Sequence, residues 1–192
     1  MKQPFLATLL ALPLAACFGG AKVPDVLLSL TPAAAVPAGQ TITPASGTIT
    51  IAVPAVPQAL ATARVPVQVS DTTVQYLKDA QWVEPPQRLF ARVLADTITA
   101  RTGRAVLSTS QSFADPGARM SGELREFGVD ASTSEAVVTF DAALTRANGT
   151  ELQKRRFTAR VPLSQVEAQA VGVALNQGAN TVAAEVADWV GR

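Results

Sequence analysis

The stretch that decides the fold is EAVVTFDAALTRANGTELQKRRFTARVPL, residues 135–163. Apolar and polar residues alternate along both of its halves, which is the period of a strand buried on one face. Asn148 and Gly149 separate the halves, and this dipeptide favours a type I′ turn. The stretch therefore predicts an antiparallel hairpin. The side chains expected to face inward are Val138, Phe140, Ala142, Leu144, Leu152, Phe157, Ala159 and Val161.

A basic run, Lys154 to Arg156, lies in the second half of this hairpin. Contact with nucleic acid is one interpretation, but we favour a solvated strand edge, where cations discourage edge-to-edge aggregation. The whole chain has 16 Lys and Arg against 15 Asp and Glu. Because these charges nearly balance, no strong field would draw the protein to nucleic acid or to anionic lipid.

Two helices are expected outside the hairpin. The first begins at Pro85 or Pro86, where proline suits the first helical turn, and ends near Gly103. The second begins at a capping box, Ser164-x-x-Glu167, and runs to about Val190. The apolar face of the first helix comprises Leu89, Phe90, Val93, Leu94, Thr97 and Ile98, and that of the second comprises Val166, Ala170, Val173, Ala174, Val182, Val186 and Val190.

Shorter β-branched runs predict further strands. They cover residues 25–30, 48–53, 65–69, 73–77 and 104–109, with a turn at Lys78 and Asp79, and another strand follows Met120 with a bulge near Gly128. The combination predicts an α+β fold, in which two main helices pack on one face of a mostly antiparallel sheet as a two-layer α/β sandwich.

The N-terminus carries a different signal. Lys2 precedes an apolar run from Pro4 to Leu14, which has the length of a secretion signal and is too short to span a bilayer. The sequence Leu14-Ala15-Ala16-Cys17 then resembles the bacterial lipoprotein box. We expect a lipoprotein signal peptide over residues 1–16, a lipidated tether over 17–24 and a single domain over 25–192.

Cys17 is the only cysteine of the chain, so it has no partner for an internal disulfide. In proteins with the lipoprotein box, the thiol carries diacylglycerol and the new amino group is acylated, and several acyl chains together anchor a protein firmly. An unmodified cysteine in an ordinary signal is the less favoured alternative. In enteric bacteria, an aspartate directly after the lipidated cysteine retains a lipoprotein at the inner membrane. Phe18 occupies this position here, which favours the periplasmic face of the outer membrane.

The sequence argues against familiar catalytic and metal chemistry. The chain has no histidine, the usual general base and a common metal ligand, and it lacks the G-x-S-x-G motif of serine hydrolases. We therefore expect no catalytic residue, no metal and no cofactor apart from the acyl groups on Cys17. An enzyme that relies on carboxylates alone is an alternative that the sequence leaves open.

The segment VQYLKDAQWVEPPQRLFARVLADTI, residues 74–98, resembles the ABC-type transport auxiliary lipoproteins, the PqiC-like family. The resemblance rests on a W-x-E-P signature just before the first long helix, here Trp82, Glu84 and Pro85, with Tyr76 leading into it. It implies an auxiliary role beside an MCE-domain protein, a permease and an ATPase that move phospholipid or other hydrophobic compounds. Because such partners are usually ring-shaped, a homo-oligomer is one further possibility.

Several alternatives stay open at this stage. Trp82 is expected to pack against the sheet beside the start of the helix rather than to contact a partner. Glu84 is expected to interact favourably with the positive end of the helix dipole. Tyr76 is expected to pack on a strand with its hydroxyl at the surface. The main functional alternative is a stand-alone carrier lipoprotein, which would need a cavity lined by apolar side chains.

Overall fold

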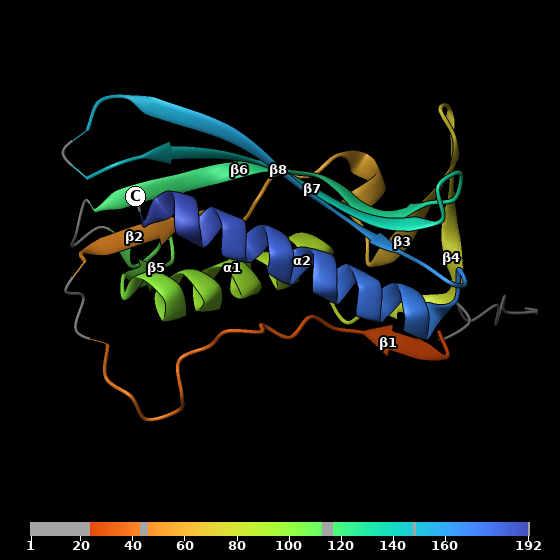
Figure 1. The fold of residues 1–192 in the computed structure, drawn as a ribbon, viewed down its shortest axis with the longest axis horizontal. Coiled ribbons are helices and arrows are strands. Elements are labelled where there is room, and N and C mark those ends of the chain that lie inside the picture. Colours follow the sequence, from red (N-terminus) through yellow and green to blue (C-terminus); the bar gives the residue numbers. More distant parts are fainter. Residues whose placement is uncertain (1–23, 43–45, 113–116, 148, 192) are drawn as a thin grey trace, which may run out of the picture.

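The computed structural model describes residues 24–42, 46–112, 117–147 and 149–191. In this part of the chain, two helices and one short 3-10 helix accompany a large sheet (Figure 1). The elements in chain order are β1 (Val26–Leu28), β2 (Thr48–Ile51), η1 (Gln58–Leu60), β3 (Arg64–Ser70), β4 (Thr73–Trp82), α1 (Pro86–Thr102), β5 (Ala105–Leu107), β6 (Ala118–Asp130), β7 (Glu135–Thr145), β8 (Leu152–Pro162) and α2 (Ala168–Val190).

The sheet is built on the three long strands β6, β7 and β8, which pair antiparallel. The other edge of β6 is shared. Its beginning pairs in parallel with β2, which continues to β5, and its end pairs in parallel with β3, which continues to β4 and β1. The sheet therefore forks along β6, and the remaining strands form two separate branches.

Both helices pack on one face of this sheet, which confirms the expected α+β architecture (Figure 1). All six residues expected on the apolar face of α1 are buried. Gly103 ends this helix with a left-handed φ of 68°, a conformation that glycine adopts without strain. An aromatic cluster fills the space beneath α1, where the Phe90 ring lies 5.3 Å from Phe140 and 6.3 Å from Phe127 between centroids.

The hairpin is confirmed, and most of its inward-facing side chains are buried. Leu152 is an exception, because it begins β8 directly after the turn of the hairpin and stays exposed. At the connection between β7 and β8, the Gly149 N–H donates to the carbonyl of Arg146. Asn148 lies outside the described residues. The basic run lies on β8, which pairs with β7 alone among the described strands and is an edge of the sheet.

The expected turn at Lys78 and Asp79 is wrong. β4 continues through it to Trp82 as a bulge, in which Asp79 takes a left-handed φ of 55°. Arg64 pairs with Gln81 but Pro66 pairs with Tyr76, so β4 holds three more residues than β3 over this interval. The strand can continue because β1 pairs with it beyond the bulge, from Ala80 to Trp82.

Two other local expectations are also wrong. The helix α2 begins at Ala168, and Glu167 at its N-cap makes no side-chain capping bond, so the capping box at Ser164 does not form. The connection must first pass from the sheet edge to the helix layer, so Val166 is exposed. Val173 is exposed as well, because the buried face of α2 runs through Val171, Ala174 and Leu175. The bulge in β6 lies at Arg125 instead of Gly128.

Candidate functional site

Trp82 is the last residue of β4 and lies inside the core with 1% of its surface exposed. Its ring lies 5.3 Å from that of Phe127 and is tilted against it. The indole N–H is buried and has no hydrogen-bond partner. Burial on this scale leaves no surface for a partner protein to contact, so the side chain acts through packing.

Tyr76 points to the opposite face of the sheet. In a regular strand, two residues separated by an even number of positions face the same side of the sheet. The bulge at Asp79 shifts the register by an odd number of residues, so Tyr76 and Trp82 face opposite sides. The Arg64 guanidinium lies 4.0 Å from the centre of the Tyr76 ring, a cation–π contact. The tyrosine hydroxyl is 3.4 Å from the carbonyl of Ala59. The motif residues Tyr76 and Trp82 therefore do not form one site.

Glu84 and Pro85 stand at the beginning of α1. Pro85 is the N-cap with an extended backbone, and Pro86 opens the helix. The Arg92 side chain donates a hydrogen bond to Glu84, and this bond holds the pKa of Glu84 below its usual value, helped by the charges of Arg92 and Arg88. The pair is substantially exposed to solvent, so it orients the helix start without adding much stability.

Cys17 and the residues expected to direct cleavage, Leu14, Ala15 and Ala16, lie outside the described residues. Neither helix in the described part of the chain combines the length and apolarity that a membrane span requires. The same residues hold no cluster of three or more potential metal ligands.

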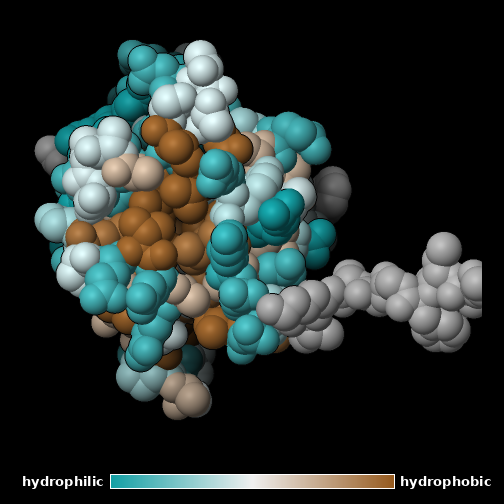
Figure 2. Space-filling model, turned by 90° about the vertical axis from the view of Figure 1, so that its right-hand side faces the viewer, coloured by the Kyte–Doolittle hydropathy of each residue, from teal (hydrophilic) through white to brown (hydrophobic). Residues whose placement is uncertain are grey.

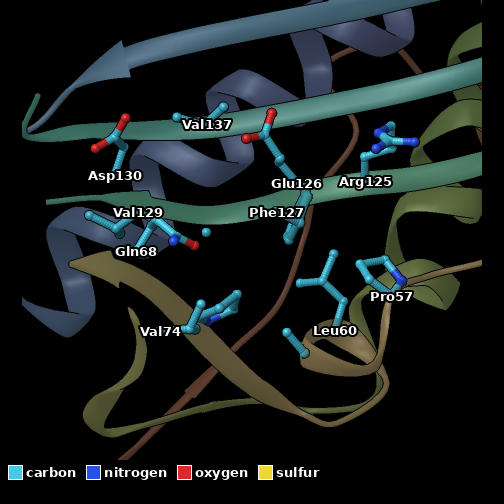
Figure 3. A pocket seen from close by; sticks show the side chains of 13 residues that line it. Pro57, Leu60, Gln68, Val74, Arg125, Glu126, Phe127, Val129, Asp130 and Val137 are labelled. Atoms are coloured by element: carbon cyan, nitrogen blue, oxygen red, sulfur yellow. The ribbon is translucent and has the colours of Figure 1, made fainter. Parts of the chain in front are cut away.

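A hollow of about 130 Å³ opens where the sheet forks, between β3 and β6 (Figure 3). Leu60 of η1 and Phe127 of β6 are buried beside it and close off the core. Its other lining residues are mainly apolar or backbone: Pro57, Ala59, Pro66, Val74, Gly128, Val129 and Val137. The polar side chains at the hollow are Gln68, Arg125, Glu126 and Asp130.

The fork is closed by a tight contact between Pro66 and Gly128. A Cβ on Gly128 would lie 2.3 Å from the Pro66 carbonyl oxygen and 2.9 Å from its ring, so only glycine fits here. Val137 pairs with Gly128 across the ladder and is buried although it stands outside the main core. Val137 is thus an apolar side chain buried on the face of the sheet that the helices leave uncovered.

Charged side chains around the hollow are already partly paired. The Arg125 guanidinium lies 3.6 Å from Glu123 and 3.7 Å from Asp141. Glu126 accepts a hydrogen bond from the Thr139 hydroxyl at 2.5 Å. Hydrogen bonds from Ser132, chiefly from its hydroxyl, lower the pKa of Asp130. The arrangement is a small apolar depression with a charged rim, and it offers no nucleophile or acid–base pair aimed at a common point.

Sequence reasoning missed this hollow. The β-branched runs predicted a strand over residues 65–69 and no element directly before it, and Pro57 and Pro66 of this stretch line the hollow. Proline there was a usable signal, because a ring without an N–H can cover an apolar depression without leaving a donor unpaired.

Known structures share the fold of this chain. A protein of Xanthomonas campestris from the DUF330 family superposes with a TM-score of 0.64 at 21% identity, covering 86% of this chain and 91% of that one. An uncharacterised protein superposes with a TM-score of 0.66 at 17% identity, covering 79% of this chain and 96% of that one. These similarities define the class: a two-layer α+β domain with a forked sheet.

The sequence also matches the model of one family, described as the ABC-type transport auxiliary lipoprotein component, over residues 28–187. The chain belongs to this family, as the segment around Trp82 predicted. The family is a transport component and not an enzyme family. No curated protein resembles the chain closely enough in sequence to count as a relative.

Proposed function

We propose that this protein is a lipid-anchored periplasmic auxiliary component of an MCE-type ABC transporter that moves phospholipid or another hydrophobic compound between membranes. The observation that carries the proposal is the family match over residues 28–187. The lipoprotein box at Leu14-Ala15-Ala16-Cys17 supports acylation of Cys17, and Phe18 supports the outer membrane. The expected partners are an MCE-domain protein and its permease and ATPase.

At the hollow between β3 and β6, docking is favoured over carriage of lipid. Two larger and more open depressions, of about 670 and 440 Å³, are lined in part by charged and polar side chains, among them Arg155 in the first and Glu167 in the second. Sites for small molecules usually enclose about 300–1,000 Å³, whereas the hollow between β3 and β6 measures about 130 Å³. An apolar cavity of about 150 Å³ holds one benzene molecule, so the hollow suits a single apolar side chain and is too small for a phospholipid. We place the partner contact here, on the sheet face that the helices leave free.

Affinity capture of the full-length lipoprotein from membranes tests the proposal, with Cys17→Ala as the comparison and mass spectrometry as the readout. The wild type should retain the MCE-domain protein with its permease and ATPase, and its N-terminal peptide should carry acyl chains. Cys17→Ala should remain unacylated and lose these partners. Wild-type protein that is captured alone, or an unacylated Cys17, would contradict the proposal.

A second pair of variants tests the placement of the contact. Val74 lines the hollow and is 43% exposed, so Val74→Glu should introduce a charge there without disturbing the core. Val173 is also an exposed valine, but it lies on α2. Val74→Glu should remain acylated and lose the MCE protein, while Val173→Glu should retain it. Equal capture by both variants would place the contact elsewhere.

The carrier alternative makes a different prediction. Lipid that co-purifies with the isolated protein in stoichiometric amount, in the absence of any MCE partner, would favour it over docking. Extraction and mass spectrometry of the captured material measure this directly.

A further inference from the structure

Apolar side chains gather at the end of the molecule where β1 begins and α2 starts, which is the right-hand end in Figure 1 and faces the viewer in Figure 2. Val26, Val69 and Val166 are exposed to 37%, 42% and 41%. Leu77, Ala131 and Leu163 are half-buried on the same group of segments. We call these six residues the end patch.

Backbone contacts bring these segments together. The Ala131 N–H donates to the carbonyl of Gln68, which joins the β6–β7 turn to the end of β3. The Leu163 N–H donates to the carbonyl of Ser134 in the same turn. Val26 pairs with Ala80 of β4. Contiguous exposed apolar surface of this kind commonly marks an interaction site.

The position of the patch relative to the chain indicates what covers it. The described chain begins at Pro24, immediately before β1, beside Tyr76 and Leu77. Residues 18–24 separate Cys17 from the domain, and seven residues span at most about 25 Å when fully extended. An anchor at Cys17 would therefore hold this end close to the bilayer surface, where the high local concentration lets a weak contact form.

We propose that the end patch rests on the surface of a zwitterionic lipid bilayer and fixes the orientation of the domain on the membrane. This inference rests on the acylation of Cys17 put forward under the proposed function. Valine and leucine side chains that enter the interface between headgroups and acyl chains gain the burial that the folded domain alone does not give them.

The charges beside the patch determine the kind of lipid. Asp25, Asp71 and Glu167 are exposed on the same segments as Val26, Val69 and Val166, and they outnumber the exposed cation Lys78 beside Leu77. These carboxylates would be repelled by anionic headgroups but not by neutral zwitterionic ones. The contact should therefore form on phosphatidylcholine and phosphatidylethanolamine and weaken when an anionic phospholipid is added.

The test uses full-length acylated protein in phosphatidylcholine–phosphatidylethanolamine vesicles. An environment-sensitive fluorophore is attached at Val166→Cys. The control is Leu152→Cys, because Leu152 is also an exposed aliphatic residue and lies at the other end of β8. Brominated lipid should quench the probe at position 166 and leave the probe at position 152 unchanged. A probe at Val26→Cys should lose its quenching when Val69→Asp and Val166→Asp are combined in the same chain.

The outcomes separate this inference from the function on which it rests. If the mass of the N-terminal peptide shows an unmodified Cys17, the anchor fails and both proposals fall. If Cys17 is acylated but the probe at position 166 is not quenched by brominated lipid, this inference alone is overturned. A probe shielded from aqueous iodide yet unquenched by lipid would also overturn it, and would identify a protein surface or a second copy of the chain as the occupant.

Discussion

Trp82 is the residue by which the sequence resembles its family, and its environment shows a structural use. Its side chain packs on Phe127 within the core beside the beginning of α1. The residues that follow it, Glu84 and Pro85, fix where the helix begins. A signature of this kind can thus be shared by a family because it joins a strand to a helix, without any of its side chains touching a partner.

Substituting Trp82 separates packing from partner contact. Trp82→Ala should lower the free energy of unfolding by about 3–5 kcal/mol, because it leaves a cavity among buried aromatic rings. Trp82→Phe should cost less, since it retains an aromatic ring and removes an indole N–H that has no partner. Urea denaturation measures both values. A stable Trp82→Ala variant that loses its transport partners would instead favour a contact role.

At the scale of elements, the uncovered sheet face is held by a cross-strand ion pair. Arg156 of β8 donates two hydrogen bonds to Asp141 of β7, at 2.6 and 2.7 Å. These bonds, together with the charges of Arg156, Arg125 and Lys154, hold the pKa of Asp141 below its usual value. Paired charges directly across a ladder stabilise the register of the two strands.

When folding lowers the pKa of a carboxyl group, that group stabilises the folded protein at pH values above its pKa in the unfolded chain. The stabilisation is lost as the pH falls through the pKa that the group has in the folded protein. Asp141→Asn should therefore lower the free energy of unfolding near neutral pH. The difference in this free energy between the variant and the wild type should shrink at pH values below the usual pKa of a carboxyl group. Urea denaturation over a pH series measures this. The control is Glu185→Gln, which removes an exposed carboxylate of α2. A difference that is constant with pH would contradict the assignment.

A second element-scale feature is the segment after β1, which is tied to α2 by two asparagines. Asn176 accepts from the Thr31 N–H at 2.9 Å, and Asn180 accepts from the Ala33 N–H at 2.6 Å. Asn180→Ala should make the Ala33 amide exchange faster with solvent deuterium, because its acceptor is gone. The neighbouring exposed Gln177→Ala should leave the exchange unchanged. Equal rates in wild type and Asn180→Ala would show that the asparagine does not hold this segment.

Much of the fold could be predicted from local pattern, and the exceptions share a cause. The apolar face of α1 and the alternation of β7 were predictable because period and burial are set within one element. The bulge at Asp79 was not, because it depends on β1 and β3 pairing with different parts of β4. The hollow was missed for the same reason, since it joins η1, β3 and β6 from distant parts of the chain.

At the scale of the whole molecule, the helix layer lies close against the long hairpin at Gly178. A Cβ there would lie 3.0 Å from a methyl group of Val138 on β7. Gly178→Leu should push α2 away from the sheet and lower the free energy of unfolding by about 1–3 kcal/mol. Near-ultraviolet circular dichroism should change as well, because Trp189 of α2 packs on Phe157 of β8.

The matched control is Val173→Leu on the same helix, where the side chain is 65% exposed. Its free energy of unfolding should stay within about 0.5 kcal/mol of the wild type. If Gly178→Leu behaved like Val173→Leu, the two layers would be less closely packed than the structure describes.

The fork in the sheet has a mechanical consequence. β6 is paired with β7 at eleven positions but with β3 at two, Val67 with Val129 and Gln68 with Asp130. A pulling force on the beginning of the described chain would enter at β1 and reach β6 through β4 and β3. The seam between β3 and β6 should then yield before the long hairpin, so that such a force would strain the hollow while β6, β7 and β8 stay paired.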